Sequence, residues 1–224
     1  MKILVVVAHP DDEVLGMGGA LLKHQSNGDN IFVHILTNGE SSRLNEVSGS
    51  KEFGNAIERR KAAAQEVSKV LAVKDLLIDN YDDQMLDTYP LISITKSIES
   101  FSKKIRPDIV YTHSNYDVNE DHRITFTAVL NAFRPAQNNY PSKILSAEIP
   151  SSTEWGYQGF FPNYFVNISD FLEKKIYLLS FYKNETRESP HPRSVDNIII
   201  NSKKWGSVIH CNAAEAFILI REVC

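Results

Sequence analysis

Ile3-Leu4-Val5-Val6-Val7-Ala8 is the stretch that decides the expected fold, and His9-Pro10-Asp11-Asp12-Glu13 follows it at once. Six consecutive apolar residues, most of them β-branched, predict a strand that is buried on both faces, as in a parallel sheet. Because ligands of open parallel sheets bind at the carboxyl ends of the strands, the polar residues after Ala8 mark the expected place of a site.

Apolar runs and helical patterns alternate along the chain. Further strands are expected at residues 31–37, 75–79, 108–112 and 143–148, with an edge strand at 164–168. Helices are expected at residues 14–23, 56–71, 91–104, 123–133 and 170–182. Ser169 is the expected N-cap of the last helix, and Gly16, Gly18 and Gly19 would allow close packing of the first. The alternation predicts an α/β fold with a mostly parallel sheet and helices on both faces.

Other segments give weaker patterns. Residues 40–54 and 150–162 have the composition of loops, whereas the patterns at 195–210 and 213–221 decide neither helix nor strand. The sequence contains no repeat and no low-complexity linker. Residues 1–224 are therefore expected to form a single domain.

Composition narrows the class of protein. The content of 42% hydrophobic and 23% charged residues is ordinary for a soluble globular protein, and a net charge of −4 argues against a nucleic-acid partner. No apolar run approaches the ~20 residues of a membrane span. Cys211 and Cys224 form neither a disulfide framework nor a thiolate zinc site, so we expect reduced thiols and a cytoplasmic protein. A homo-oligomer is left open.

The polar segment after the first strand contains groups that bind metals. Imidazole and carboxylate are good zinc ligands, and Pro10 restricts the backbone beside them. His9 and Asp12, three residues apart, can converge on one ion if the chain enters a helical turn, which leaves Asp11 beside the metal. The alternative is that the acids merely stabilise the N-terminus of a helix.

A second polar segment, residues 112–122, follows the strand expected at 108–112 and should open on the same sheet edge. It supplies His113, Asp117, Asp121 and His122. His122 is the predicted third ligand, because two histidines and one carboxylate leave the open position of a catalytic zinc site. A single histidine is usually an ordinary core or surface residue, but two polar clusters at one sheet edge favour a metal site.

These motifs resemble a known family. Residues 8–13, Ala-His-Pro-Asp-Asp-Glu, resemble the signature of the PIG-L/LmbE-like zinc-dependent N-deacetylases, and residues 121–123, Asp-His-Arg, resemble the second metal motif of that family. The turn at 37–40 and the segment 214–217 are similar to two further family elements. The resemblance spans nearly the whole chain, but its specificity lies in the first two motifs.

The resemblance implies roles for individual residues. It makes His9, Asp12 and His122 the zinc ligands and Asp11 the general base. It also implies a Rossmann-like sheet and substrates that carry an N-acetyl group on an amino sugar.

The chain departs from the family pattern at Asn119, where many members have a histidine that stabilises the oxyanion or donates a proton. Asn119 can donate a hydrogen bond to an oxyanion but cannot shuttle protons, and His113 is a candidate substitute. Arg60 fits a family position that contacts the sugar, although Ala63 replaces the glutamate expected three residues later. The alternative for Arg60 is a solvated helix face.

His191 and Arg193 form a further feature. They lie in the segment Ser189-Pro190-His191-Pro192-Arg193, after the helix expected at 170–182. They could reach the rim of the pocket and bind a phosphate or carboxylate of the substrate, or they could belong to a rigid surface turn.

The expected function is zinc-dependent removal of an N-acetyl group from an N-acetylamino sugar or its conjugate, with release of acetate. Zinc would activate a water whose proton Asp11 accepts and later returns to the departing amine. Two alternatives stay open, namely an amidase for another small amide such as a thiol conjugate, and a sugar-nucleotide-binding relative without activity. The presence of Asp11 favours catalysis, because a binding protein needs no base beside its metal.

Overall fold

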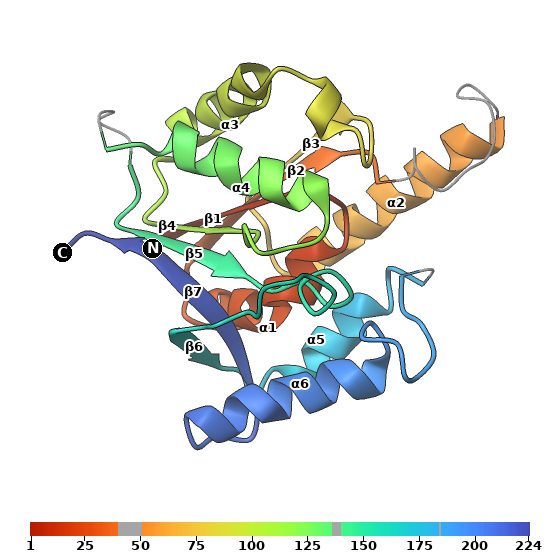
Figure 1. The fold of residues 1–224 in the computed structure, drawn as a ribbon, viewed down its shortest axis with the longest axis vertical. Helices are drawn as coiled ribbons and strands as arrows, with labels where there is room; N and C mark the ends of the chain where they lie inside the picture. Colours follow the sequence, from red (N-terminus) through yellow and green to blue (C-terminus); the bar gives the residue numbers. More distant parts are fainter. Residues whose placement is uncertain (40–50, 136–139, 184) are drawn as a thin grey trace.

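The computed structural model describes residues 1–39, 51–135, 140–183 and 185–224, and its strands form one sheet in the order β3-β2-β1-β4-β5-β7-β6 (Figure 1). The strands are β1 (Lys2–Val7), β2 (Asn30–Thr37), β3 (Asp75–Tyr81), β4 (Ile109–Thr112), β5 (Lys143–Ala147), β6 (Tyr164–Asn167) and β7 (Ala214–Glu222). Strands β1 to β5 pair in parallel, whereas β7 runs antiparallel between β5 and β6. The expected α/β fold with a mostly parallel sheet is confirmed.

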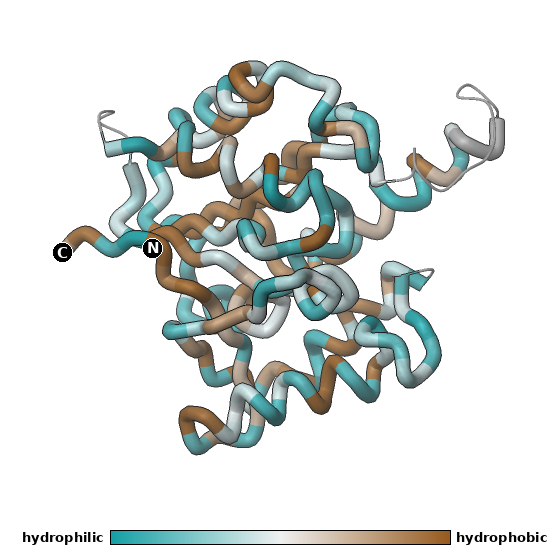
Figure 2. Tube along the Cα trace, in the orientation of Figure 1, coloured by the Kyte–Doolittle hydropathy of each residue, from teal (hydrophilic) through white to brown (hydrophobic). Residues whose placement is uncertain are grey.

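Helices cover both faces of the sheet. They are α1 (Asp12–Ser26), α2 (Lys51–Val70), α3 (Leu91–Ile105), α4 (Glu120–Ala132), α5 (Leu172–Leu179) and α6 (Val195–Val208), with a short 3₁₀ turn, η1 (Leu86–Thr88). In β1, Ile3, Val5 and Val7 join the core beneath α1 and α2, and Leu4 and Val6 join the core beneath α3 and α4. Figure 2 shows the apolar colour concentrated along these inner strands. A strand buried on both faces therefore explains the continuous apolar run.

Two local predictions are wrong. Helix α2 begins at Lys51, inside the stretch expected to be a loop, where Lys51, Glu52 and Ala56 are good helix formers although Gly54 is not. Positions 40–50 of that loop lie outside the described residues. Ser169 does not cap α5, whose N-cap is Phe171. The Ser169 hydroxyl instead donates to Asn167 Oδ1 at 2.7 Å.

The C-terminal segments that the pattern left undecided are α6 and β7, and β7 is tied to the first helix. The Glu215 carboxylate accepts from the backbone N–H groups of Gly19 (2.8 Å) and Ala20 (2.7 Å). It also pairs with Lys175 at 2.7 Å, and the Lys175 ammonium donates to Leu15 O at 2.9 Å. Both backbone groups lie in the middle of α1, where Leu15 O and Gly19 N are a pair of the i to i−4 pattern of a helix. The buried ion pair therefore links β7 and α5 to the middle of α1.

Close packing around α1 agrees with its glycine content. A Cβ atom on Gly19 would lie 2.8 Å from two carbons of Ile168, and one on Gly16 would lie 2.8 Å from Ile149 Cδ1. Both cysteines are free thiols. Within the part of the chain that the structure describes, no helix is long and apolar enough to cross a bilayer.

Candidate metal centre and active site

Two polar segments meet at the carboxyl edge of the sheet, one after β1 and one after β4. His9 Nδ1 lies 3.2 Å from Asp12 Oδ2 and 3.2 Å from His122 Nε2, and His122 Nε2 lies 3.3 Å from Asp12 Oδ2. The three atoms thus form a nearly equilateral triangle. All three side chains are buried, so the triangle is shielded from bulk water.

The triangle has the dimensions of a tetrahedral metal site. Zinc bonds of ~2.0–2.2 Å to nitrogen and oxygen place neighbouring donor atoms about 3.3–3.6 Å apart at the tetrahedral angle. In addition, Asp12 Oδ1 is buried and has no hydrogen-bond partner among the described residues. Two imidazoles and one carboxylate therefore fit a zinc ion with an open fourth position.

The outer nitrogen of each ligand imidazole is held by a carboxylate. His122 Nδ1 lies 2.8 Å from Asp117 Oδ2, and His9 Nε2 lies 3.0 Å from Asp121 Oδ2 and 2.9 Å from Asp83 Oδ1. Such partners fix the tautomer and orientation of a metal-binding histidine. The two other candidate metal groups among the described residues use these outer carboxylates together with His9 or His122, so they share residues with this centre.

The carboxylates also make the centre electrostatically favourable for positive charge. Burial alone would lower the pKa of His122, but the nearby Asp12 and Asp117 outweigh it and raise the pKa to about 9. For His9, hydrogen bonds to Asp12, Asp121 and a third carboxylate likewise overcome burial and raise the pKa well above its usual value. A buried cluster that holds protons so strongly is suited to a cation.

Asp11 lies beside the triangle, directly before the ligand candidate Asp12 in the sequence. Its backbone has φ 125° and ψ −29°, a strained conformation for a residue with a side chain. Glu13 Oε2 accepts from the Asp11 N–H at 3.0 Å, and the Glu13 Oε1 atom accepts from the Tyr182 hydroxyl. Burial raises the pKa of Asp11 to about 6, although Arg60 and Arg193 oppose that shift.

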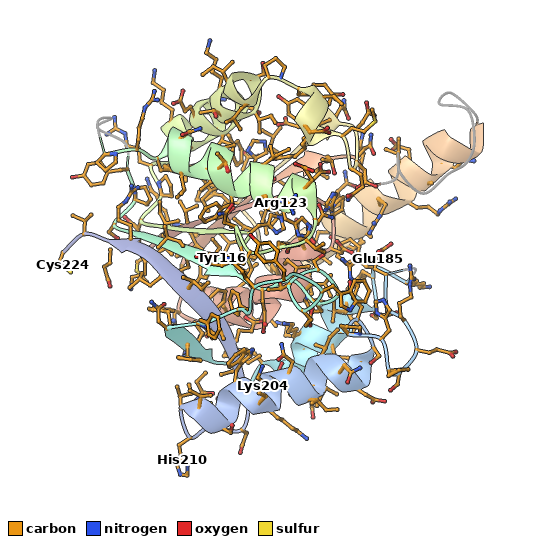
Figure 3. The ribbon with its side chains drawn as sticks, in the orientation of Figure 1. Tyr116, Arg123, Glu185, Lys204, His210 and Cys224 are labelled. Atoms are coloured by element: carbon orange, nitrogen blue, oxygen red, sulfur yellow. The ribbon has the colours of Figure 1, made fainter. Side chains whose placement is uncertain are left out.

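A buried network of alternating charges surrounds Asp11. Its Oδ2 lies 3.1 Å from an Arg193 nitrogen and 3.5 Å from an Arg60 nitrogen, and Glu185 pairs with the same Arg60 and Arg193 nitrogens at 3.1 Å and 3.4 Å. Arg60 also donates to the carbonyls of Pro10 (2.9 Å) and Gly39 (3.1 Å). The solvated helix face considered for Arg60 is therefore wrong. Figure 3 shows Glu185 between α4 and α6, on the loop after α5.

The turn after β2 is fitted to this network. Gly39 has φ +77°, and a Cβ atom there would lie 2.8 Å from Pro10 Cδ. A side chain at this position would be strained and would collide with the proline ring. The turn that resembles a family element thus keeps the metal motif and Arg60 close together.

His113 is fully buried against the metal centre. Its Nε2 accepts from the Ala8 N–H at 2.8 Å, and its ring stacks on His122 with centroids 3.9 Å apart and planes 9° apart. Burial and the neighbouring His122 lower the pKa of His113 well below its usual value. The ring therefore packs on His122 and accepts from the backbone of Ala8, and a catalytic role of His113 stays a prediction.

Asn119 is the N-cap of α4, where its Oδ1 accepts from the His122 N–H at 3.4 Å. It also lines a cleft of about 370 Å³. The other lining residues are Gln84, Val118, Ser151, Ser152, Trp155, Arg187, His191 and Arg193. The cleft reaches the metal centre through its inner residues, since Gln84 Nε2 lies 3.4 Å from His9 Nε2 and Arg193 pairs with Asp11.

Several site residues escaped the sequence reasoning. Asp83 and Gln84 follow β3 as His9 follows β1, so the strand-end argument could have found them. Glu185 lies between α5 and α6 in a segment without a pattern, and Trp155 lies in an irregular loop. No local signal marks either residue.

Among α/β proteins, a buried centre of two histidines and one carboxylate beside a second carboxylate is typical of metal-dependent hydrolases, and the chain is assigned to that class. The family described as PIG-L, GlcNAc-PI de-N-acetylase, matches residues 4–133, more than half of the chain. The chain therefore belongs to the PIG-L family.

Individual relatives support this placement. The chain is 30% identical to diacetylchitobiose deacetylase of Thermococcus kodakarensis over 206 residues, which cover 87% of this chain and 72% of that enzyme. The structure is similar to that of N,N'-diacetylchitobiose deacetylase from Pyrococcus horikoshii in complex with an inhibitor, with a TM-score of 0.79, 22% identity, and coverage of 98% of this chain and 83% of that one.

The fold alone does not define the reaction. The structure is also similar to GalB, the 4-carboxy-2-hydroxymuconate hydratase of Pseudomonas putida, with a TM-score of 0.73 and 18% identity, over 100% of this chain and 97% of that one. The residues of the site must therefore carry the functional argument.

Proposed function

We propose that this chain is a zinc-dependent hydrolase that removes the N-acetyl group from an N-acetylamino sugar or its conjugate and releases acetate. The observation that carries the proposal is the triangle of donor atoms from His9, Asp12 and His122, with the buried carboxylate of Asp11 beside it. The 30% identity to a deacetylase of an N-acetylated sugar supports the substrate class.

The protein side chains divide the chemistry among them. His9, Asp12 and His122 would hold the ion, which when bound lowers the pKa of a water and polarises an amide carbonyl. Asp11, with a pKa of about 6, is largely ionised at neutral pH and accepts a proton from the attacking water. Asp11 then gives this proton to the departing amine, so that water is added across the C–N bond.

The remaining candidates take supporting roles in this proposal. Asn119 turns its Oδ1 to the helix N-terminus, which leaves its amide N–H groups for the developing oxyanion. His113 supports the metal centre instead of acting as the acid, because Ala8 occupies its Nε2 atom. Arg60 and Arg193 orient Asp11, and His191 lines the substrate cleft.

The two neighbouring aspartates provide the test. Asp12→Ala should lose the metal, whereas Asp11→Asn should keep it and lose ~10²–10⁴-fold in turnover, because only the base is removed. Metal content per chain and acetate release on a panel of N-acetylamino sugars measure both effects. Near-full activity of Asp11→Asn would show that another group is the base, and a metal-loaded wild type that releases no acetate would reject the deacetylase proposal.

We also propose that the protein works in the cytoplasm, which its two free thiols support. Fractionation of cells that produce the chain tests this location. Sedimentation velocity decides between a monomer and the homo-oligomer that the sequence leaves open.

A further inference from the structure

Trp155 is an exposed aromatic residue in a cleft lined mostly by polar side chains. Its side chain is 59% exposed, although it lines the same cleft as Asn119, His191 and Arg193. Clefts that bind small molecules are commonly lined by aromatic side chains together with a few placed polar groups. The indole thus offers a flat apolar surface within the cleft.

The loop that carries Trp155 is fixed by hydrogen bonds in the residues just before the indole. Ile149 N donates to Thr153 Oγ1 at 2.8 Å, and Ser151 N donates to Glu154 Oε2 at 2.8 Å. Val118 N donates to Ser152 O at 3.3 Å, which joins the loop to the segment before the metal ligand of α4. The position of the indole is thus tied to that of the metal centre.

Two further contacts orient the indole. The His191 ring meets it nearly edge-on, with centroids 5.6 Å apart and planes at 85°. A Cβ atom on Gly156 would lie 2.8 Å from Tyr116 O, so the chain directly after Trp155 packs closely against the neighbouring loop. Figure 3 shows Tyr116 near the middle of the molecule. An aromatic side chain held in one orientation loses little entropy when a ligand stacks on it.

We propose that Trp155 is the stacking platform for a second sugar ring, so that the preferred substrate is an N-acetylated disaccharide or longer glycoside. This inference rests on the proposed deacetylase function. The N-acetylated ring occupies the inner end of the cleft, beside Asp11 and Asn119, and the next ring lies towards Trp155. A pyranose presents an apolar C–H face to an indole, and a cleft of about 370 Å³ is within the usual range for small-molecule sites.

Substrate length separates this role from a general structural one. Trp155→Ala should lower kcat/KM for N,N'-diacetylchitobiose about 2- to 12-fold, mainly through KM, and leave free N-acetylglucosamine unchanged. Trp155→Phe should restore most of the loss. Tyr157→Ala is the matched control, since Tyr157 lies on the same loop but is 97% exposed and does not line the cleft. Equal losses on both sugars, or no loss on either, would overturn the platform.

Fluorescence provides a readout that does not depend on turnover. The chain has two tryptophans, and Trp205 is only 9% exposed. The disaccharide should change the emission of the wild type at concentrations where the monosaccharide does not, and it should leave Trp155→Phe unchanged. An emission change without acetate release would keep the platform and reject the deacetylase function. Turnover without any preference for the disaccharide would reject the platform alone.

Discussion

Asp117 holds one of the proposed metal ligands without belonging to the metal triangle. Its Oδ2 lies 2.8 Å from His122 Nδ1, and its Oδ1 accepts from the Asn119 N–H at 2.8 Å. Asp117→Asn keeps the shape but removes the charge that orients the imidazole, so metal affinity should fall ~10- to 100-fold. Competition with a chelator measures the metal affinity. The control is Glu120→Gln, at an exposed position in the first turn of α4, which should bind metal like the wild type. An unchanged metal affinity in Asp117→Asn would contradict the argument.

Asn119 has two roles that substitutions can separate. As the oxyanion donor it should lower the activation barrier by about 2.7–4 kcal/mol. As an N-cap it should add about 0.5–2 kcal/mol to the free energy of unfolding. Asn119→Ala should lose both, whereas Asn119→Asp should keep the cap and lose the N–H donor. Single-turnover rates and thermal unfolding measure the two effects. An unchanged kcat in Asn119→Ala would assign the oxyanion to another group.

Sequence reasoning reached those residues of the site that follow directly after a strand of the parallel sheet, His122 in the segment after β4 among them. His9, Asp11 and Asp12 leave a strand and enter a helix within a few residues, so their spacing predicts their convergence. The network around Asp11 is different, because Arg60 and Glu185 meet only through the packing of α2 against the loop after α5. The pairing of Arg60 with Asp11 and Glu185 arises from this burial and not from sequence spacing, and a contact of Arg60 with the sugar stays a prediction.

Helix α1 offers a paired test of packing at the scale of an element. Gly19→Ala should lower the free energy of unfolding by about 1–3 kcal/mol, because the new Cβ would collide with Ile168. Gly54→Ala, in α2, should raise it by about 0.5–1 kcal/mol, because no atom lies within 4 Å of the new Cβ and alanine favours a helix. Denaturant titrations of both variants measure the difference, and a neutral Gly19→Ala would show that α1 can shift away from the chain around Ile168.

The parallel half of the sheet could be predicted from sequence, whereas the C-terminal half could not. Strands β1 to β5 alternate with helices, and that alternation implies parallel crossovers. Strand β7 has an apolar pattern that does not specify its neighbours, and it pairs antiparallel with β5 and β6 from far along the chain. Its place depends on long-range contacts such as that of Glu215 with α1, which no sequence window contains.

The molecule as a whole contains more than the part that the family match covers. That match ends at residue 133, yet the sheet continues through β5, β7 and β6. Arg193 and Glu185 from the later part complete the environment of Asp11, and Glu215 and Lys175 hold α1. The catalytic centre therefore needs both parts, which supports the prediction that residues 1–224 form one domain.

A single domain should unfold in one cooperative transition. Trp155 and Trp205 report on the part after residue 133, and far-ultraviolet circular dichroism reports on helices throughout. In Glu215→Gln the Lys175 ammonium stays buried without its charged partner, a defect that costs about 3–5 kcal/mol. Because β7, α5 and α1 share this ion pair, both signals should shift to lower denaturant by the same amount and stay coincident. If the tryptophan signal moved alone, the C-terminal part would be a separate folding unit.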